Sequence, residues 1–157
     1  MNEHHEDQWK NLSKWLTDNW GGPETSRISE TAAERNMSDR DLKKASKKFA
    51  QENFQGKKFL NEDTGREILV SRDGLDKWDN KTTSRDQSLS IKKLNEILNR
   101  SKKISDEPDR KGRKFVDGFT YYEHPINVNK KPYTAKTATK DTQGNSKYYY
   151  HFLEDKK

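Results

Sequence analysis

Residues 114–154 decide the fold, and they read KFVDGFTYYEHPINVNKKPYTAKTATKDTQGNSKYYYHFLE. Two runs of turn-forming residues, 129–132 and 141–145, divide this stretch into segments rich in Tyr, Phe, Val and Thr. The first strand should cover residues 114–122 and can continue after Pro125, and the others should cover 133–140 and 147–154. Because short turns join neighbouring strands, the pattern predicts an antiparallel meander.

Just upstream of the meander, the sequence predicts a helix with one apolar face. Its apolar residues recur at helical spacing: Leu89, Ile91, Leu94, Ile97 and Leu98. Residues 58–60 and 67–70 flank a turn-rich run and predict a β-hairpin, and a short helix should start at Ser71. A helix lying on the sheet would bury the apolar faces of both elements, which predicts an α+β layer.

The first third of the chain is predicted to be helical. Trp9, Trp15 and Trp20 share one face of a helix over residues 9–20, and Ser26 or Ser29 could cap a short second helix. Ser38 and Asp41 predict the start of a third helix, which should end near residue 56. We therefore divide the chain into a helical segment, residues 1–56, and an α+β domain, residues 57–157. The predicted fold class is α+β, with N-terminal helices followed by a helix-backed, twisted antiparallel sheet of about four strands.

Composition and charge limit the classes of function that the chain can have. The chain has 157 residues, a net charge of +6 and no cysteine, which excludes disulfides, thiolate catalysis and Cys–zinc sites. No apolar run is long enough to span a membrane, and we predict a cytoplasmic protein without metal or cofactor. The positive charge favours RNA or another nucleic acid as partner. The predicted phosphate contacts are Lys43, Lys44, Lys47, Lys48, Arg110, Lys114, Lys130 and Lys131.

The last two predicted strands carry side chains suited to metal-free RNA cleavage, which needs proton transfer and a cation for the phosphorane charge. His151 is the candidate general acid or base and Lys136 the candidate cation, with Thr137 and Tyr149 as positioning residues. Strand alternation predicts that Tyr149 and His151 share a face. His151 could instead form hydrogen bonds within a Tyr-rich sheet, and Lys136 could be an ordinary solvated strand lysine.

Other side chains of the meander also leave two interpretations open. His124 could add a second imidazole to the site or be a turn residue without such a role. Four tyrosines could stack on bases, although core packing is expected for at least half of them: Tyr121, Tyr122, Tyr148 and Tyr150.

The ordered series of motifs from residue 59 to residue 154 resembles phage-associated nuclease-like domains of the barnase/EndoU/colicin/RelE group. The matching motifs are DTGREI (63–68), SRDGL (71–75), EPDRKG (107–112), FTYY (119–122), PINVNKKPY (125–133) and YYHFLE (149–154), together with Lys136. The resemblance implies a protein of a phage or mobile element, in the host cell or virion, that cleaves RNA by attack of the 2′-hydroxyl.

Two positions depart from that pattern and support an alternative function. Residues 77–81 occupy the region where similar domains often carry a histidine, and Tyr150 stands where they tend to carry Asp. The alternative is a non-enzymatic phage accessory protein that uses a degenerate nuclease scaffold to inhibit a host defence factor, by binding a host protein or a nucleic-acid complex. A structural component of the virion is a third interpretation.

Overall fold

The computed structural model describes residues 25–156 of the chain. In chain order the elements are β1 (Ser26–Ile28), α2 (Ala32–Arg35), α3 (Asp39–Asn53), β2 (Lys58–Leu60), β3 (Glu67–Leu69), α4 (Arg72–Lys81), α5 (Arg85–Ser90), the short 3-10 helix η1 (Ile91–Lys93), α6 (Leu94–Arg100), β4 (Lys102–Pro108), β5 (Gly118–Val128), β6 (Lys131–Thr142) and β7 (Asn145–Asp155). Among these residues no helix is both long and apolar enough to cross a membrane.

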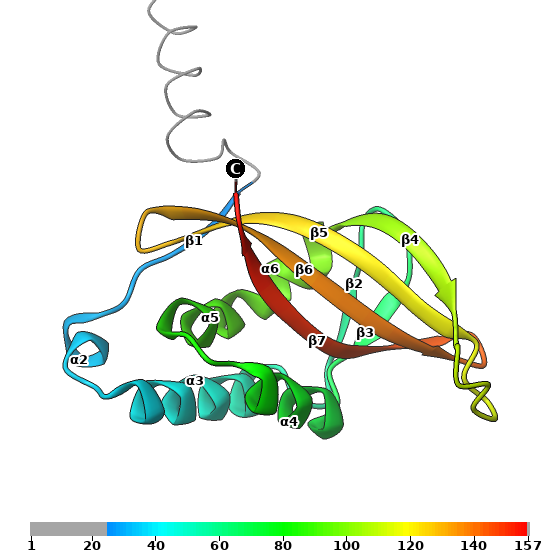
Figure 1. The fold of residues 1–157 in the computed structure, drawn as a ribbon, viewed down its shortest axis with the longest axis horizontal. Helices are drawn as coiled ribbons and strands as arrows, with labels where there is room; N and C mark the ends of the chain where they lie inside the picture. The colour runs from blue at the N-terminus through cyan, green and yellow to red at the C-terminus, as the bar shows by residue number, and fades with distance from the viewer. Residues whose placement is uncertain (1–24, 157) are drawn as a thin grey trace, which may run out of the picture.

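The strands form one mixed, curled sheet of seven strands (Figure 1). Six of them follow the order β1-β5-β6-β7-β3-β2, and β4 pairs with the first half of β5, whereas β1 pairs with its end. The long strands β5, β6 and β7 are antiparallel neighbours, as predicted for the meander. Strand β1 runs parallel to β5, and β3 runs parallel to β7. The sheet is therefore a half-barrel, and the helices lie on one of its faces (Figure 1).

Two-residue turns connect the strands of the meander. Asn129 and Lys130 have φ values of 50° and 69°, and Gln143 and Gly144 have 48° and 83°. Positive φ at both central residues matches the right-handed twist of the flanking strands, which explains why the register of each long hairpin continues to its turn.

The predicted sheet of about four antiparallel strands behind N-terminal helices is wrong. Strand β1 lies where serines had suggested a helix cap, and β4 lies in a charged stretch for which no strand was predicted. Both are edge segments: β1 has three residues, and most of β4 is exposed, so neither shows the alternation that marks a half-buried strand. The helix predicted over residues 9–20 lies outside the described residues.

The helices start where short polar side chains cap them. Ser38 accepts a hydrogen bond from the backbone of Asp41 and starts α3, while Thr31, and not Ser26 or Ser29, caps α2. The helix predicted around residues 89–98 is present, but η1 divides it into α5 and α6. The hairpin of β2 and β3 is confirmed.

Two apolar clusters fill the space between the helices and the sheet. Trp78, Tyr122 and Tyr148 belong to one, and Leu42, Ile97 and Ile126 belong to the other. Helix α3 contributes to both clusters, since Ala50 and Phe54 at its end pack in the first. A division of the chain at residue 56 stays a prediction, and α3 shares its core with elements on the other side of that boundary.

Candidate nucleic-acid interface

An irregular register in β7 decides which side chains reach solvent. Ala138 lies opposite Tyr150, whereas the next residue, Thr139, lies opposite Tyr148, so Tyr149 is an extra residue in a β-bulge. The prediction that Tyr149 and His151 share a face is therefore wrong. Because of the bulge, Tyr148 and His151 both point to the helices.

His151 is fully buried on the helix-covered face. Its Nε2 lies 2.8 Å from the Ser90 hydroxyl oxygen, and its Nδ1 lies 2.6 Å from that of Tyr148. The Ser90 hydroxyl donates its proton to the carbonyl of Gln87, so it accepts from His151 Nε2. Burial lowers the pKa of His151 to about 3. These contacts support the interpretation of a neutral histidine bonded within a Tyr-rich sheet.

Lys136 and Thr137 do not form a site with His151. Lys136 points to the opposite face, where its Nζ lies 3.1 Å from Glu123 Oε1 and 3.4 Å from Glu154 Oε2. Thr137 lies opposite His151, but it is buried and its hydroxyl has no hydrogen-bond partner. The predicted catalytic residues are thus divided between the two faces of the sheet.

His124 is also buried, at the junction of β1 and β5. Its Nε2 lies 2.8 Å from Ser26 Oγ, and Ser26 donates to Glu96 Oε1 over 3.0 Å, so His124 is the donor to Ser26. Burial, with a smaller effect of Arg100, lowers the pKa of His124 to about 4. This relay attaches the short strand β1 to the rest of the fold.

On the face opposite the helices, aromatic side chains of β5 and β7 form a surface that we call the open-face platform: Phe119, Tyr121, Tyr149, Tyr150 and Phe152. Ring centroids are 5.2 Å apart for Phe119 and Tyr149, 5.5 Å for Tyr149 and Tyr150, and 6.3 Å for Tyr150 and Phe152. Tyr121, Tyr150 and Phe152 line a hollow of about 310 Å³ together with Ile104. Of the four tyrosines considered for base stacking, Tyr122 and Tyr148 are core residues, as expected for at least half of them.

Helix α4 places two lysines at the edge of the open-face platform. The Nζ of Lys77 lies 3.8 Å from the ring centroid of Tyr149, and one helical turn later the Nζ of Lys81 lies 4.1 Å from that of Tyr150. Gly74 allows this close packing, because a Cβ there would lie 2.2 Å from the carbonyl oxygen of Tyr148. Neither lysine was a predicted site residue. Their separation of four residues places both on one face of a helix that starts after Ser71, but it does not indicate which surface that face meets.

A cationic pocket of about 270 Å³ adjoins the platform at the start of α4. Four basic residues line it, with Ser71, Asp73 and Tyr149: Lys77, Arg113, Lys140 and Lys147. Hydrogen bonding from Lys77, with a smaller contribution from Arg113, lowers the pKa of Tyr149. A second basic hollow, of about 830 Å³, lies on α3, but three of its lysines are paired with carboxylates: Lys43, Lys47 and Lys48. The pocket at α4 differs from it in adjoining the open-face platform through Tyr149.

The predicted phosphate contacts lie elsewhere. Lys43 and Lys47 on α3 pair with Asp79, Lys47 also pairs with Asp76, and Lys48 pairs with Glu52. The remaining predicted contacts are exposed on α3, on the loop between β4 and β5, and at the turn into β6: Lys44, Arg110, Lys114, Lys130 and Lys131. The four lysines of α3 line one hollow together, whereas the other four predicted contacts do not line it.

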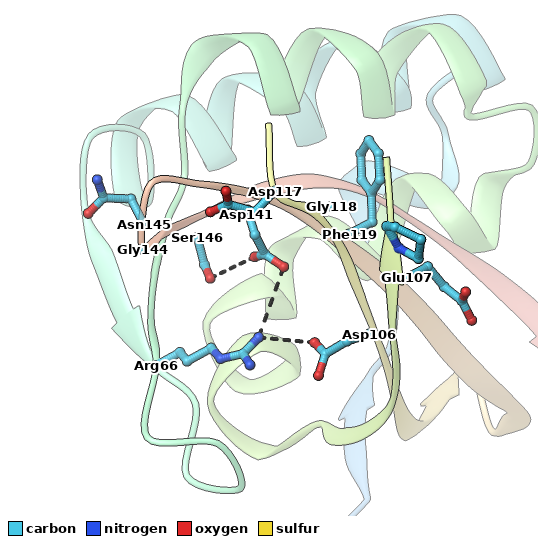
Figure 2. A pocket seen from close by; sticks show the side chains of 11 residues that line it. Arg66, Asp106, Glu107, Asp117, Gly118, Phe119, Asp141, Gly144, Asn145 and Ser146 are labelled. Atoms are coloured by element: carbon cyan, nitrogen blue, oxygen red, sulfur yellow. Dashed lines mark hydrogen bonds and ion pairs between the residues drawn. The ribbon is translucent and has the colours of Figure 1, made fainter. Parts of the chain in front are cut away.

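The hollow shown in Figure 2 has the opposite charge. Its volume is about 500 Å³, and Arg66 projects into it between Asp106 and Asp141. Arg66 Nη1 donates to Thr120 Oγ1 over 2.8 Å and to Asp106 over 3.3 Å, which ties the β2–β3 hairpin to β4 and β5. Hydrogen bonding, mainly from Lys103, lowers the pKa of Asp106 to about 2. Because carboxylates outnumber this one arginine, the hollow does not suit a phosphate.

Within residues 25–156, no three His, Asp or Glu side chains are placed to hold a metal ion together. No curated protein and no solved structure matches the chain. The family model of large polyvalent protein-associated domain 3 matches residues 37–150, which is well over half of the chain. The predicted association with phages or mobile elements is thereby confirmed, whereas the nuclease-like subtype stays a prediction. The chain belongs to the large polyvalent protein-associated domain 3 family, a family of phage-associated protein domains.

Proposed function

We propose that the chain binds single-stranded nucleic acid, with RNA as the first candidate, on the open-face platform. The observation that carries the proposal is the row of rings from Phe119 to Phe152 with Lys77 and Lys81 along one edge. Bases stack on exposed aromatic rings with about 1–3 kcal/mol each, and nearby cations hold the phosphates.

The arrangement of charge suggests how a strand would lie. The lysines of α4 are beside β7, so phosphates would follow this edge while the bases turn toward Tyr150 and Phe152. The hollow next to Tyr121 could take a base edge, and Lys136 and Glu123 at its rim offer a hydrogen-bond donor and an acceptor. Duplex bases are already stacked on one another and cannot reach such a surface, which favours a single strand.

Fluorescence anisotropy with a labelled single-stranded RNA of ten nucleotides tests this proposal. Tyr150→Ala and Lys81→Gln should weaken binding, whereas Lys48→Gln, which changes an exposed lysine on α3, should not. Equal loss with Lys48→Gln would place binding on α3. Absence of binding to any strand would refute the proposal and favour the alternative, in which the chain binds a host protein.

Metal-independent RNA cleavage is the second candidate function, and one observation favours it at a different residue. The hydroxyl of Tyr149 accepts a hydrogen bond from Lys77 in the cationic pocket, and its pKa is lowered there. A phenolate could take the proton of the 2′-hydroxyl, which then attacks phosphorus. The bond from phosphorus to the 5′-oxygen breaks, and a lysine ammonium protonates the leaving oxygen.

Incubation of labelled RNA with excess EDTA tests this second function. We expect a 2′,3′-cyclic phosphate product, resistance of DNA, and loss of cleavage in Tyr149→Phe, with Tyr121→Phe as the control. Cleavage that persists in Tyr149→Phe but is lost in Lys136→Ala would favour the site first predicted from the sequence. Binding without any cleavage would leave the chain a binding protein.

A further inference from the structure

We infer that the cationic pocket binds a terminal phosphate of the strand, that is, a phosphomonoester. This inference rests on the proposed function, because it specifies the end of the nucleic acid that the same surface would hold. The pocket lies where the open-face platform meets α4, and Tyr149 belongs to both.

The charges of the pocket are not balanced by the described residues. Asp109 neutralises Arg113, with 3.1 Å between its Oδ1 and Arg113 Nη2, and Asp73 can compensate one further charge. Lys77 donates a hydrogen bond to the hydroxyl of Tyr149. In the binding function, unlike in the cleavage reaction, this hydroxyl keeps its proton and so removes no positive charge from the pocket. Of the four basic side chains, two positive charges therefore remain without a counter-ion among the described residues.

The pairing of β6 with β7 makes the excess of positive charge destabilising for the fold. Lys140 lies directly opposite Lys147 in the register of β6 and β7, and among residues 25–156 neither of them makes an ion pair. Like charges directly opposite each other destabilise a sheet. An anion between the two ammonium groups would turn this repulsion into attraction, which is a reason for the pair to exist.

The number of charges distinguishes the kind of phosphate. A phosphomonoester carries about −1.5 to −2 at pH 7, because its second pKa is near 6, and a backbone diester carries about −1. The excess of two positive charges matches the monoester. Lys140 and Lys147 can each donate to its oxygens, and so can the hydroxyl of Ser71, whose oxygen already accepts from the backbone of Gly74.

Three RNA oligomers of one sequence test the inference: one with a 5′-phosphate, one with a 3′-phosphate, and one with hydroxyls at both ends. We expect one phosphorylated form to bind about tenfold more tightly than the hydroxyl form at pH 7.5. The preference should decrease at pH 5.5, where most of the dianionic monoester takes up one proton and becomes a monoanion. The phosphorylated oligomer that binds more tightly identifies which end of the strand enters the pocket.

Variants connect the preference to the pocket. Lys140→Gln and Lys147→Gln should each abolish the preference for a phosphorylated end, while the oligomer with two hydroxyl ends binds within about threefold of wild type. Neither variant should lower Tm, because each removes the repulsion between the two lysines. Lys131→Gln, on the same strand β6 but outside the pocket, should keep the preference. Equal affinity for all three oligomers, or a preference that survives both pocket variants, overturns the inference while the proposed function stands. Failure of every oligomer to bind overturns both.

Discussion

Lowering the pH from 7 to 5 should destabilise the fold strongly, because two buried histidines must stay neutral. Their folded pKa values are about 3 for His151 and about 4 for His124, against 6.5 for an ordinary histidine. Below pH 6.5 the unfolded chain takes up protons that the native state does not, so stability falls as the pH falls toward the folded pKa values. At pH 5 each histidine then costs about 2 kcal/mol, or about 4 kcal/mol together.

Urea unfolding followed by tryptophan fluorescence at pH 7, 6 and 5 measures this loss. His151→Gln and His124→Gln remove one titrating group each, so each variant should lose about half as much stability over this interval as the wild-type protein does. The carboxylates with lowered pKa values take up their protons mostly below pH 5 in both states, so they contribute little over this interval: Glu34, Glu96, Asp106 and Asp109.

A pH dependence that is the same in the wild-type protein and in His151→Gln would contradict the burial of a neutral His151. It would mean that the imidazole is solvated, as a catalytic acid or base of the open face would be. Titration of His151 by NMR near pH 6.5 in the folded protein would lead to the same conclusion.

Three further predictions concern packing and charge. Gly74→Ala should lower the free energy of unfolding by about 1–3 kcal/mol in urea titrations, because its Cβ would meet the backbone of Tyr148 at 2.2 Å, and an unchanged midpoint would contradict the packing of α4 on β7. Thr137→Val should raise the melting temperature, since it removes a buried hydroxyl without a partner, and a lower one would reveal a hydrogen bond. RNA affinity should fall with salt by a slope of about −0.7 per phosphate contact, and a flat dependence would exclude phosphate contacts.

The meander could be predicted from the sequence because its signals are local. Turn residues at 129–130 and 143–144 and the Tyr-rich segments between them specify the long hairpins without reference to the rest of the chain. The parallel pairings could not be predicted in this way. Strands β1 and β3 have only three residues each, and their partners lie far away in the sequence, so nothing local distinguishes them from loops.

The candidate site was harder to predict, because one extra residue changes the face of every side chain on one side of it. The bulge at Tyr149 moves His151 to the core and leaves Tyr150 and Phe152 on the open face. Strict alternation would instead place His151 on the same face as Tyr149, with Tyr150 and Phe152 on the other face. The lysines of α4 reach the site through the contact of Gly74 with β7, which is a tertiary contact without a pattern in the sequence.

Photo-crosslinking shows directly whether nucleic acid binds on the open-face platform. A single-stranded RNA that carries 4-thiouridine is irradiated with the full chain, and the crosslinked peptides are identified by mass spectrometry. We expect crosslinks at Tyr150 and Phe152 on β7 and at Tyr121 on β5, and an excess of unlabelled strand should reduce them. Crosslinks confined to the lysines of α3, or none on β5 and β7, would contradict binding on the open-face platform.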